Sequence, residues 1–216
     1  MAAIKAVLGV RITCPNDICL VECGYPTLPA LIKEKQYNYY SNITRTRAGM
    51  DDDPFMFMLS VARDNNTPGS RYIDSVLTHT QSSFIVDSLN SIKDNVRTAN
   101  GSKFKTYCET NPEMIKHCMY TNGQIPEWRR IPYSRFRLSA HRLKVETGRW
   151  SRIPREARLC DCGIQQVQDE KHFVETCLYL IDLRLEYPNM TFKLPEFHDQ
   201  QESASFVYKA MNILNL

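Results

Sequence analysis

Four residues of the types that bind zinc stand within eighteen positions near the carboxyl end of the chain. They form the pattern C-x-C-x9-H-x4-C, made by Cys160, Cys162, His172 and Cys177. A closed structural zinc site takes four Cys and His ligands in a tetrahedron, and a short loop followed by a helix can supply them. One residue separates the first two cysteines, where about two to four are usual. The pattern predicts one structural zinc ion, and the alternative is a cluster of reduced thiols.

The residues around this pattern indicate how the chain positions it. Gly163 suits a tight turn directly after the second cysteine. A helix is expected to begin at Asp169 or Glu170, with His172 in its first turn and Cys177 in its second. A turn and a helix would then bring the two halves of the pattern together without a large core.

Positive charge is concentrated just before the zinc pattern. Residues 129–158 hold nine arginines and one lysine against two acids, a net charge of +8, whereas the whole chain carries +3. The rest of the chain is therefore at −5, since the two parts together give +3. Clustered like charge repels itself, and a polyanion relieves that repulsion. This concentration of charge predicts that the segment binds RNA or DNA. The alternative is that the segment is a basic helix face in contact with solvent.

A helix is predicted over residues 134–147, with Ser134 as its N-cap. At about 100° per residue, Phe136, Ala140 and Leu143 form a buried stripe on this helix. His141 does not lie on that stripe. Its possible roles are a phosphate contact, a brace for the zinc loop, or that of an ordinary exposed or buried histidine.

Arginines and an aromatic residue lie on the rest of this segment. Two arginines share a second face of the predicted helix, and the linker of residues 149–159 adds three of its four arginines and a tryptophan. A guanidinium binds phosphate and an aromatic ring stacks on a base. The residues predicted to bind nucleic acid are Arg135, Arg142, Trp150, Arg152, Arg155 and Arg158.

The remaining cysteines are predicted to be small buried residues, not ligands. None has a full set of Cys or His partners at metal-site spacing, even though three of them cluster near the N-terminus and one is next to His117. These residues are Cys14, Cys19, Cys23, Cys108 and Cys118.

The apolar periodicity predicts a mostly α fold, a multi-helix bundle with a small zinc-knuckle subdomain near the C-terminus. A proline- and glycine-containing linker is expected at residues 121–132. We therefore expect a helical domain over residues 1–125, a basic helix with the zinc knuckle over 126–190, and a C-terminal helix within 191–216. The expected helices are 4–10, one capped by Asn16 or Asp17 and ended by Gly24, 28–47, a buried 54–63, 70–79, 83–98, two short ones within 103–119, 134–147, 170–187 and 201–216.

The sequence carries no signal for a membrane. No apolar run approaches the roughly 20 residues that a membrane helix needs, and the N-terminus lacks the apolar core of a secretory signal. We therefore expect an intracellular protein, nuclear or cytoplasmic, with no membrane partner. In a reducing compartment its eight cysteines are thiols or metal ligands.

Two stretches resemble the carboxyl-terminal region of reverse-transcriptase polyproteins from LINE-type (non-LTR) retrotransposons. The first is FRLSAHRLKVETGRW followed by RLCDCG, DEKHF, a cysteine, and a helix with a Tyr and an Arg. This resemblance implies that Cys160, Cys162, His172 and Cys177 are zinc ligands of a knuckle. It also implies that Tyr179 and Arg184 mark the following helix.

The second stretch is CPNDICLVECGYPTLPALIKEKQYNYYSNI. It is similar to the short helix, E-x-G-x-x-P-L turn and long basic helix that follow the polymerase thumb in those proteins. Glu22, Gly24 and Pro26 are the matching positions.

The resemblance implies a module without catalysis. The polymerase's Asp-Asp motif would lie upstream of residue 1, and the 39 residues after Cys177 are too few for an appended nuclease. Asp51, Asp52 and Asp53 are expected to precede a helix that Asp53 caps, not to bind a catalytic metal. We therefore expect a non-catalytic, zinc-stabilised nucleic-acid-binding module with no small-molecule substrate. The alternative is a structural or protein-interaction domain in which zinc only stabilises the fold.

Overall fold

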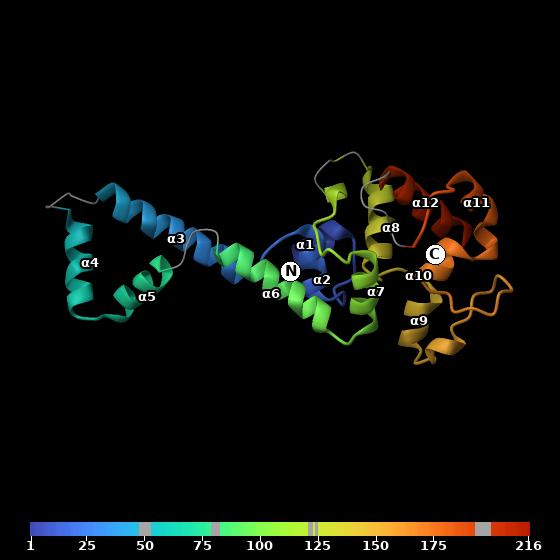
Figure 1. Ribbon diagram of the computed structural model, residues 1–216, viewed down its shortest axis with the longest axis horizontal. Coiled ribbons are helices and arrows are strands. Elements are labelled where there is room, and N and C mark those ends of the chain that lie inside the picture. Colours follow the sequence, from blue (N-terminus) through green and yellow to red (C-terminus); the bar gives the residue numbers. More distant parts are fainter. Residues whose placement is uncertain (48–52, 79–82, 121–122, 124, 193–199) are drawn as a thin grey trace. The chain divides into compact units, whose positions relative to one another are not determined.

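The computed structural model describes residues 1–47, 53–78, 83–120, 123, 125–192 and 200–216. Over these residues the chain forms twelve α-helices and three short 3-10 helices (Figure 1). The one β-contact found there is an isolated antiparallel bridge between Leu159 and Val167. The prediction of a mostly α fold is confirmed.

Contacts divide the chain into two compact units. One unit is continuous and comprises residues 25–94, whereas the other combines residues 1–24 with residues 95–216. The first two helices therefore pack with the carboxyl-terminal half, although more than 70 residues separate them in sequence. The boundaries predicted at residues 125 and 190 follow composition, which carries no information on such long-range packing.

The continuous unit is a set of helices joined by capped turns. Its helices are α3 (Leu28–Arg47), α4 (Pro54–Asp64), α5 (Pro68–Leu77) and most of α6 (Ser83–Thr98). Asp53 caps α4, since its Oδ1 accepts the backbone N–H groups of Phe55 and Met56 at 3.0 Å each. The predicted cap is therefore confirmed, while Asp51 and Asp52 lie outside the described residues.

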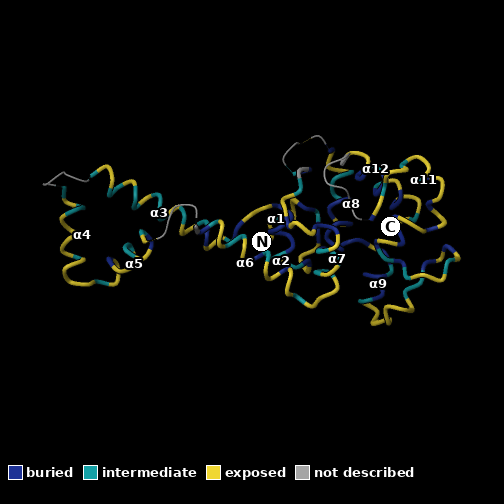
Figure 2. Tube along the Cα trace, viewed as in Figure 1, coloured by how far each residue is buried: buried dark blue, intermediate teal, exposed yellow. Residues whose placement is uncertain are grey.

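Helix α4 is not the buried helix that its apolar sequence predicts. Most of α4 is exposed (Figure 2). Phe57 and Met58 are 68% and 70% exposed, and Leu59 is its one buried residue. Apolar residues lie all around α4, but α5 is the main element of its unit that packs against it. One neighbour covers one face, so the other apolar side chains meet solvent.

The discontinuous unit holds the core and the cysteine-histidine pattern. Helices α8 and α12 make its most extensive helix pair. Of the two short helices expected within residues 103–119, the second is only a 3-10 turn. Its elements are α1 (Ala2–Leu8), α2 (Asn16–Cys23), α7 (Ser102–Thr110), η1 (Cys118–Tyr120), α8 (Glu127–Arg137), α9 (Lys144–Trp150), η2 (Arg155–Ala157), α10 (Glu170–Glu175), η3 (Leu178–Leu180), α11 (Ile181–Glu186) and α12 (Gln200–Ile213).

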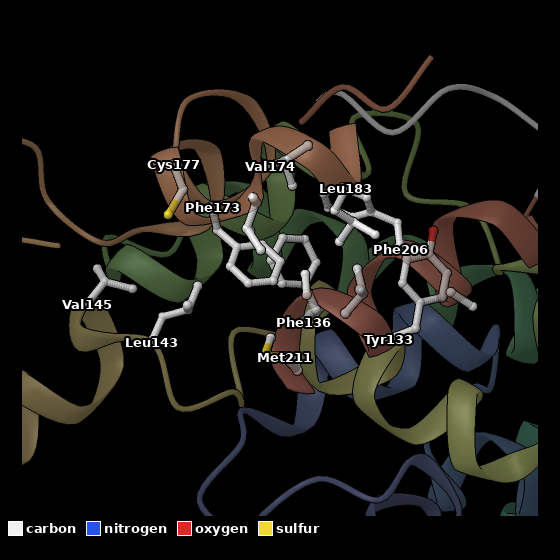
Figure 3. Packing of buried hydrophobic residues seen from close by; sticks show 14 of the residues in the cluster. Tyr133, Phe136, Leu143, Val145, Phe173, Val174, Cys177, Leu183, Phe206 and Met211 are labelled. Atoms are coloured by element: carbon white, nitrogen blue, oxygen red, sulfur yellow. The ribbon is translucent and has the colours of Figure 1, made fainter. Parts of the chain in front are cut away.

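Aromatic rings link the helices of this core. The ring centroids of Phe136 and Phe173 lie 5.3 Å apart, and those of Phe173 and Phe206 lie 6.3 Å apart (Figure 3). All three rings are buried, and the same cluster includes the three cysteines of the zinc pattern. The predicted zinc loop is therefore part of the core and not an appendage to it.

A buried ion pair joins α2 to α8. Nε of Arg137 donates to Glu22 at 2.6 Å and its second guanidinium nitrogen donates at 3.1 Å, with the Tyr107 hydroxyl on the same carboxylate at 2.8 Å. Helix α2 is buried over most of its length (Figure 2). Its N-cap is Pro15, so the expected cap at Asn16 or Asp17 is wrong, whereas Gly24 ends it in the left-handed conformation as expected.

The helix predicted over residues 134–147 is wrong, because the chain leaves the helix at Ser139. Helix α8 begins at Glu127, inside the expected linker, and accommodates Pro132. Ser139 has a φ of 46°, and its carbonyl accepts Lys103 Nζ at 2.7 Å while its hydroxyl donates to Glu170 at 2.7 Å. These distant partners stabilise a conformation that local sequence disfavours.

Candidate metal centre

A short hairpin positions the first two cysteines. The Leu159–Val167 bridge sets its base, and the Cys160 N–H donates to the Gln166 carbonyl at 2.9 Å. Gly163 turns the chain with a φ of 89°, which a residue with a side chain adopts only with strain. The expected turn after Cys162 is therefore present.

Helix α10 positions the histidine. Asp169 caps it by accepting the His172 N–H at 2.9 Å, which places His172 in the first turn as expected. The helix ends at Glu175, so Cys177 does not lie on its second turn. Cys177 instead caps η3, and its N–H donates back to the His172 carbonyl at 2.8 Å. The helix expected over residues 170–187 is therefore three short pieces.

The four predicted ligands come together. Their ligand atoms all lie within 4.8 Å of one another and all four residues are buried. Sγ of Cys160 is 3.8 Å from Sγ of Cys177, and Sγ of Cys162 is 3.4 Å from Nε2 of His172. A tetrahedron with metal–sulfur bonds of about 2.3 Å and metal–nitrogen bonds of about 2.0 Å has edges of roughly 3.8 and 3.5 Å. These two edges match that tetrahedron, so the four side chains are compatible with a metal site.

Two glutamines orient the ligands. Nδ1 of His172 is 2.9 Å from Oε1 of Gln166, so this nitrogen carries the proton and Nε2 is left for a metal. Thr176 Oγ1 also donates to that glutamine oxygen at 2.9 Å. The Gln168 amide donates to Cys160 Sγ at 3.6 Å, while its oxygen accepts the Lys144 N–H at 2.9 Å. Sequence reasoning missed both glutamines, and the polar run QQVQ between the ligands was the available signal.

Burial and backbone hydrogen bonds act in opposite directions on the thiols. Burial raises the pKa of Cys160, and it raises that of Cys177 to about 12. Burial opposes ionisation of Cys162 too, but backbone N–H groups of Leu178 and Ile164 donate to its sulfur and bring its pKa below the ordinary value. Cys160 and Cys177 are therefore thiols when no cation is present, and a divalent metal must displace their protons.

A cation lies close enough to influence the cluster. Nη1 of Arg184 is buried and has no hydrogen-bond partner in the described part of the chain. Burial lowers the pKa of His172, the charge of Asp169 opposes this, and the charge of Arg184 lowers it further; the net lowering favours the neutral imidazole that a ligand must be. Three thiolates with one divalent metal leave a charge of about −1, which this guanidinium offsets.

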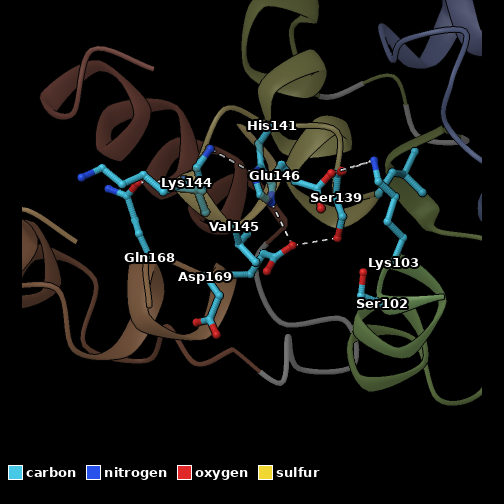
Figure 4. A network of polar contacts seen from close by, with 12 residues as sticks. Ser102, Lys103, Ser139, His141, Lys144, Val145, Glu146, Gln168 and Asp169 are labelled. Carbon is cyan, nitrogen blue, oxygen red and sulfur yellow. Dashed lines mark hydrogen bonds and ion pairs between the residues drawn. The ribbon is translucent and has the colours of Figure 1, made fainter. Parts of the chain in front are cut away.

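His141 braces the site and does not face solvent. It is buried, its Nδ1 accepts the Leu143 N–H at 3.2 Å, and its Nε2 lies 2.9 Å from Glu170 on α10 (Figure 4). Glu170 also accepts the Ser139 hydroxyl, and these partners outweigh burial and lower its pKa to about 2. Of the alternatives that the sequence left open for His141, the structure shows a buried, hydrogen-bonded histidine whose partner Glu170 lies on the helix of His172.

Three of the predicted nucleic-acid-binding arginines have partners inside the chain. Arg158 donates to the carbonyls of Val145 and Ile153, Arg155 pairs with Asp169 at 3.0 Å, and Arg135 donates to the Gly9 carbonyl at 2.6 Å. Other cations of residues 129–158 are paired as well, including Arg137 in the buried pair, Arg149 with Glu146, and Lys144 with Asp161. The net charge of +8 therefore overstates the cationic surface.

The other three predicted residues face solvent. Arg142 precedes α9 and Arg152 follows it; both are exposed, and neither side chain has a hydrogen bond or ion pair with another described residue. Trp150 ends α9 and is 56% exposed. The guanidinium carbon of Arg11, a residue outside the basic segment, lies 4.0 Å from the centroid of the Trp150 ring. Charge counting along the sequence missed Arg11, because it joins this surface only through the fold.

The remaining cysteines form no metal cluster within the described ranges. Cys14 and Cys19 are buried with their sulfurs 3.6 Å apart, and Cys23 is buried on α2. Cys108 is half-buried and lies near the Val96 carbonyl. The side chain of Cys118 lies outside the description.

Comparisons with protein-family models, with curated proteins and with solved structures find no match for this chain. The resemblance to retrotransposon proteins therefore stays a prediction. Among the described helices, none has the length and apolar character needed to cross a membrane.

Proposed function

We propose that this chain is a non-catalytic, zinc-stabilised module that binds RNA or DNA, derived from the carboxyl-terminal region of a non-LTR retrotransposon reverse transcriptase. The observation that carries the proposal is the exposed set of Arg142, Trp150 and Arg152 on and around α9, which the hairpin of the cysteine-histidine cluster holds in place. The retrotransposon origin rests on the sequence resemblance.

Zinc is the metal that suits this cluster. Three thiolates and one imidazole are soft to intermediate ligands, and their tetrahedral spacing is the preference of Zn²⁺. Four protein ligands leave no open position for water or substrate, so the metal is structural. Purified protein is expected to contain about one zinc per chain, and Cys177→Ser to lose it. Less than half an equivalent in the wild type, or full zinc in the variant, would refute the assignment.

The hairpin and α9 are connected by direct hydrogen bonds. The Val145 N–H donates to the Gln168 carbonyl at 3.1 Å, and the Lys144 N–H donates to the Gln168 side chain. Helix α9 has seven residues, about 10 Å, and Arg142 lies just before its start while Trp150 and Arg152 lie at its end. Cations and an exposed ring at this spacing suit a nucleic-acid backbone and its bases.

The number of free cations sets the expected salt dependence. With about three to five phosphate contacts, the logarithm of the binding constant should fall against the logarithm of salt with a slope of roughly −2 to −4. The test is a salt titration on one fixed oligonucleotide. Binding that is absent at low salt would refute the proposal.

The sharpest variant combines Arg142→Ala with Arg152→Gly. Arg152 has a φ of 55° at the end of α9, where Ile153 N–H donates to the Gly148 carbonyl and Arg152 N–H to the Arg149 carbonyl. Glycine is the favoured residue at this helix end, so the change removes charge while it relieves the backbone. The slope should flatten by about 1.5, the equivalent of two phosphates.

The matched control removes two exposed cations from the other unit, Lys33→Ala with Arg71→Ala. It changes the net charge equally and should leave the slope within error. An equal loss in both double variants would mean that total charge, and not the surface around α9, governs binding.

A protein-interaction domain is the second candidate. The exposed Phe57 and Met58 on α4 favour it, because large apolar side chains at a surface mark sites of association. Phe57→Ser with Met58→Ser should then abolish binding of a protein partner without changing the salt titration.

A further inference from the structure

Trp150 has one covered face and a largely exposed ring. Arg11 lies in the turn between α1 and α2, and its guanidinium carbon is 4.0 Å from the ring centroid, the distance of a stacked cation–π pair. The side chain nevertheless stays 56% exposed. Within the described residues no aromatic ring contacts Trp150. A flat ligand can therefore stack on the side of the indole that Arg11 does not occupy.

Trp128 provides an internal comparison. It is 51% exposed, and Arg129 lies over its ring at 4.5 Å. The ring of Tyr208 on α12 meets it edge-on at 4.7 Å. Trp128 is thus part of the contact between α8 and α12. Trp150 ends a helix, and among the described residues its ring has a cation–π contact with Arg11 and no contact with another aromatic ring.

We propose that Trp150, backed by Arg11, stacks an unpaired base, so that the ligand of the surface around α9 is single-stranded nucleic acid. This inference rests on the proposed function. The stacked guanidinium holds the indole in one orientation and adds a charge for the phosphate beside the base. Arg152, two residues further on, supplies a second charge. A duplex hides its base faces inside the helix, so it can use the charges but not the ring.

The magnitude follows from the energetics of stacking. Base–aromatic stacking changes single-strand affinity by roughly 5- to 150-fold when the ring is removed. Trp150→Ala should therefore weaken binding of a 12-mer of deoxythymidine by a factor in this range. The same variant should change binding of a duplex of equal charge by less than about 2-fold. Trp150→Phe retains a ring and should recover most of the loss.

Arg11→Ala and Arg11→Lys test the backing residue. Arg11→Ala removes both the stack and a charge, so single-strand binding should weaken and its salt slope should flatten by about 0.7. Arg11→Lys retains the charge without the planar group. Its salt slope should therefore equal that of the wild type, while its single-strand affinity should stay below the wild-type affinity. Trp128→Ala is the matched control and should leave both ligands within about 2-fold.

Fluorescence provides a readout independent of affinity. The chain has two tryptophans, so a Trp128→Phe background leaves Trp150 as the one reporter. Its emission should be quenched by the single strand and not by the duplex. Zinc content of each variant, measured alongside, shows that the cluster is intact.

The outcomes separate the two proposals. If the wild type binds neither ligand at low salt, the proposed function fails and this inference fails with it. If the wild type binds with a salt slope but Trp150→Ala weakens both ligands equally, or neither, nucleic-acid binding stands and the stacking inference is wrong. A selective loss on the single strand with quenching of Trp150 supports both.

Discussion

Gln166→Ala should lower the zinc affinity of the cluster without removing a ligand. Gln166 Oε1 accepts the proton on Nδ1 of His172 at 2.9 Å, which fixes the tautomer that leaves Nε2 for the metal. Loss of such a partner costs about 10- to 100-fold in metal affinity. Gln166 is exposed, so water can replace it, and Thr176 Oγ1 already lies 2.9 Å from the same nitrogen. We therefore expect the lower end, about 10-fold or about 1.4 kcal/mol.

Competition with a chromophoric chelator at fixed pH measures this change. Gln165→Ala is the matched control, because Gln165 is the adjacent exposed glutamine and its side chain has no hydrogen bond with another described residue. Gln166→Ala combined with Thr176→Val removes both partners of Nδ1 and should approach 100-fold. Unchanged affinity in Gln166→Ala, or an equal loss in Gln165→Ala, would refute the positioning role.

Three further predictions concern stability and linkage. Arg137→Met leaves Glu22 buried without its cation and should lower the free energy of unfolding by about 3 to 5 kcal/mol, whereas adding Glu22→Gln should restore much of it in urea titrations. Burial lowers the pKa of His117 to about 4, so between pH 6.5 and 4 the unfolded chain binds a proton that the folded chain does not. As the pH is lowered through this range, the free energy of unfolding should fall by up to about 1.4 kcal/mol per pH unit. The fall should be smaller in His117→Gln. Any effect of zinc release at low pH is common to both proteins and cancels in the comparison. Chelation of zinc should weaken oligonucleotide binding, because the positions of Arg142, Trp150 and Arg152 depend on the hairpin that the cluster closes; an unchanged affinity would contradict the link between the cluster and α9.

Local patterns were sufficient for much of the fold. The helix over residues 28–47 matches α3, and Asp53 before Pro54 forms the expected cap. Both depend on periodicity and capping, which neighbouring residues determine. Ser139 shows where this information ends: its left-handed conformation depends on Lys103 and Glu170, which are 36 and 31 residues away.

The candidate site divides in the same way. The four ligands follow from residue type and spacing, since few other arrangements of Cys and His are so dense. The role of Gln166 does not follow, because an amide becomes a positioning group only when a hairpin brings it to a ligand. Charge counting treated Arg137 and Arg158 as surface cations, yet one is buried against Glu22 and the other binds two carbonyls. A sequence gives the sign of a side chain and not the direction in which it points.

The contacts around Gln168 connect the buried cysteine-histidine cluster to α9, an element that contains none of the four cluster residues. Its amide donates to Cys160, its side-chain oxygen accepts the first N–H of α9, and its carbonyl accepts the N–H of Val145. Arg158, two residues before the first ligand, donates to the Val145 carbonyl and packs over Gly148, where a Cβ would lie 2.8 Å from its side chain. Helix α9 has only seven residues and would not be stable alone. Its position, and with it that of Arg142, Trp150 and Arg152, therefore depends on the hairpin that the four ligands close.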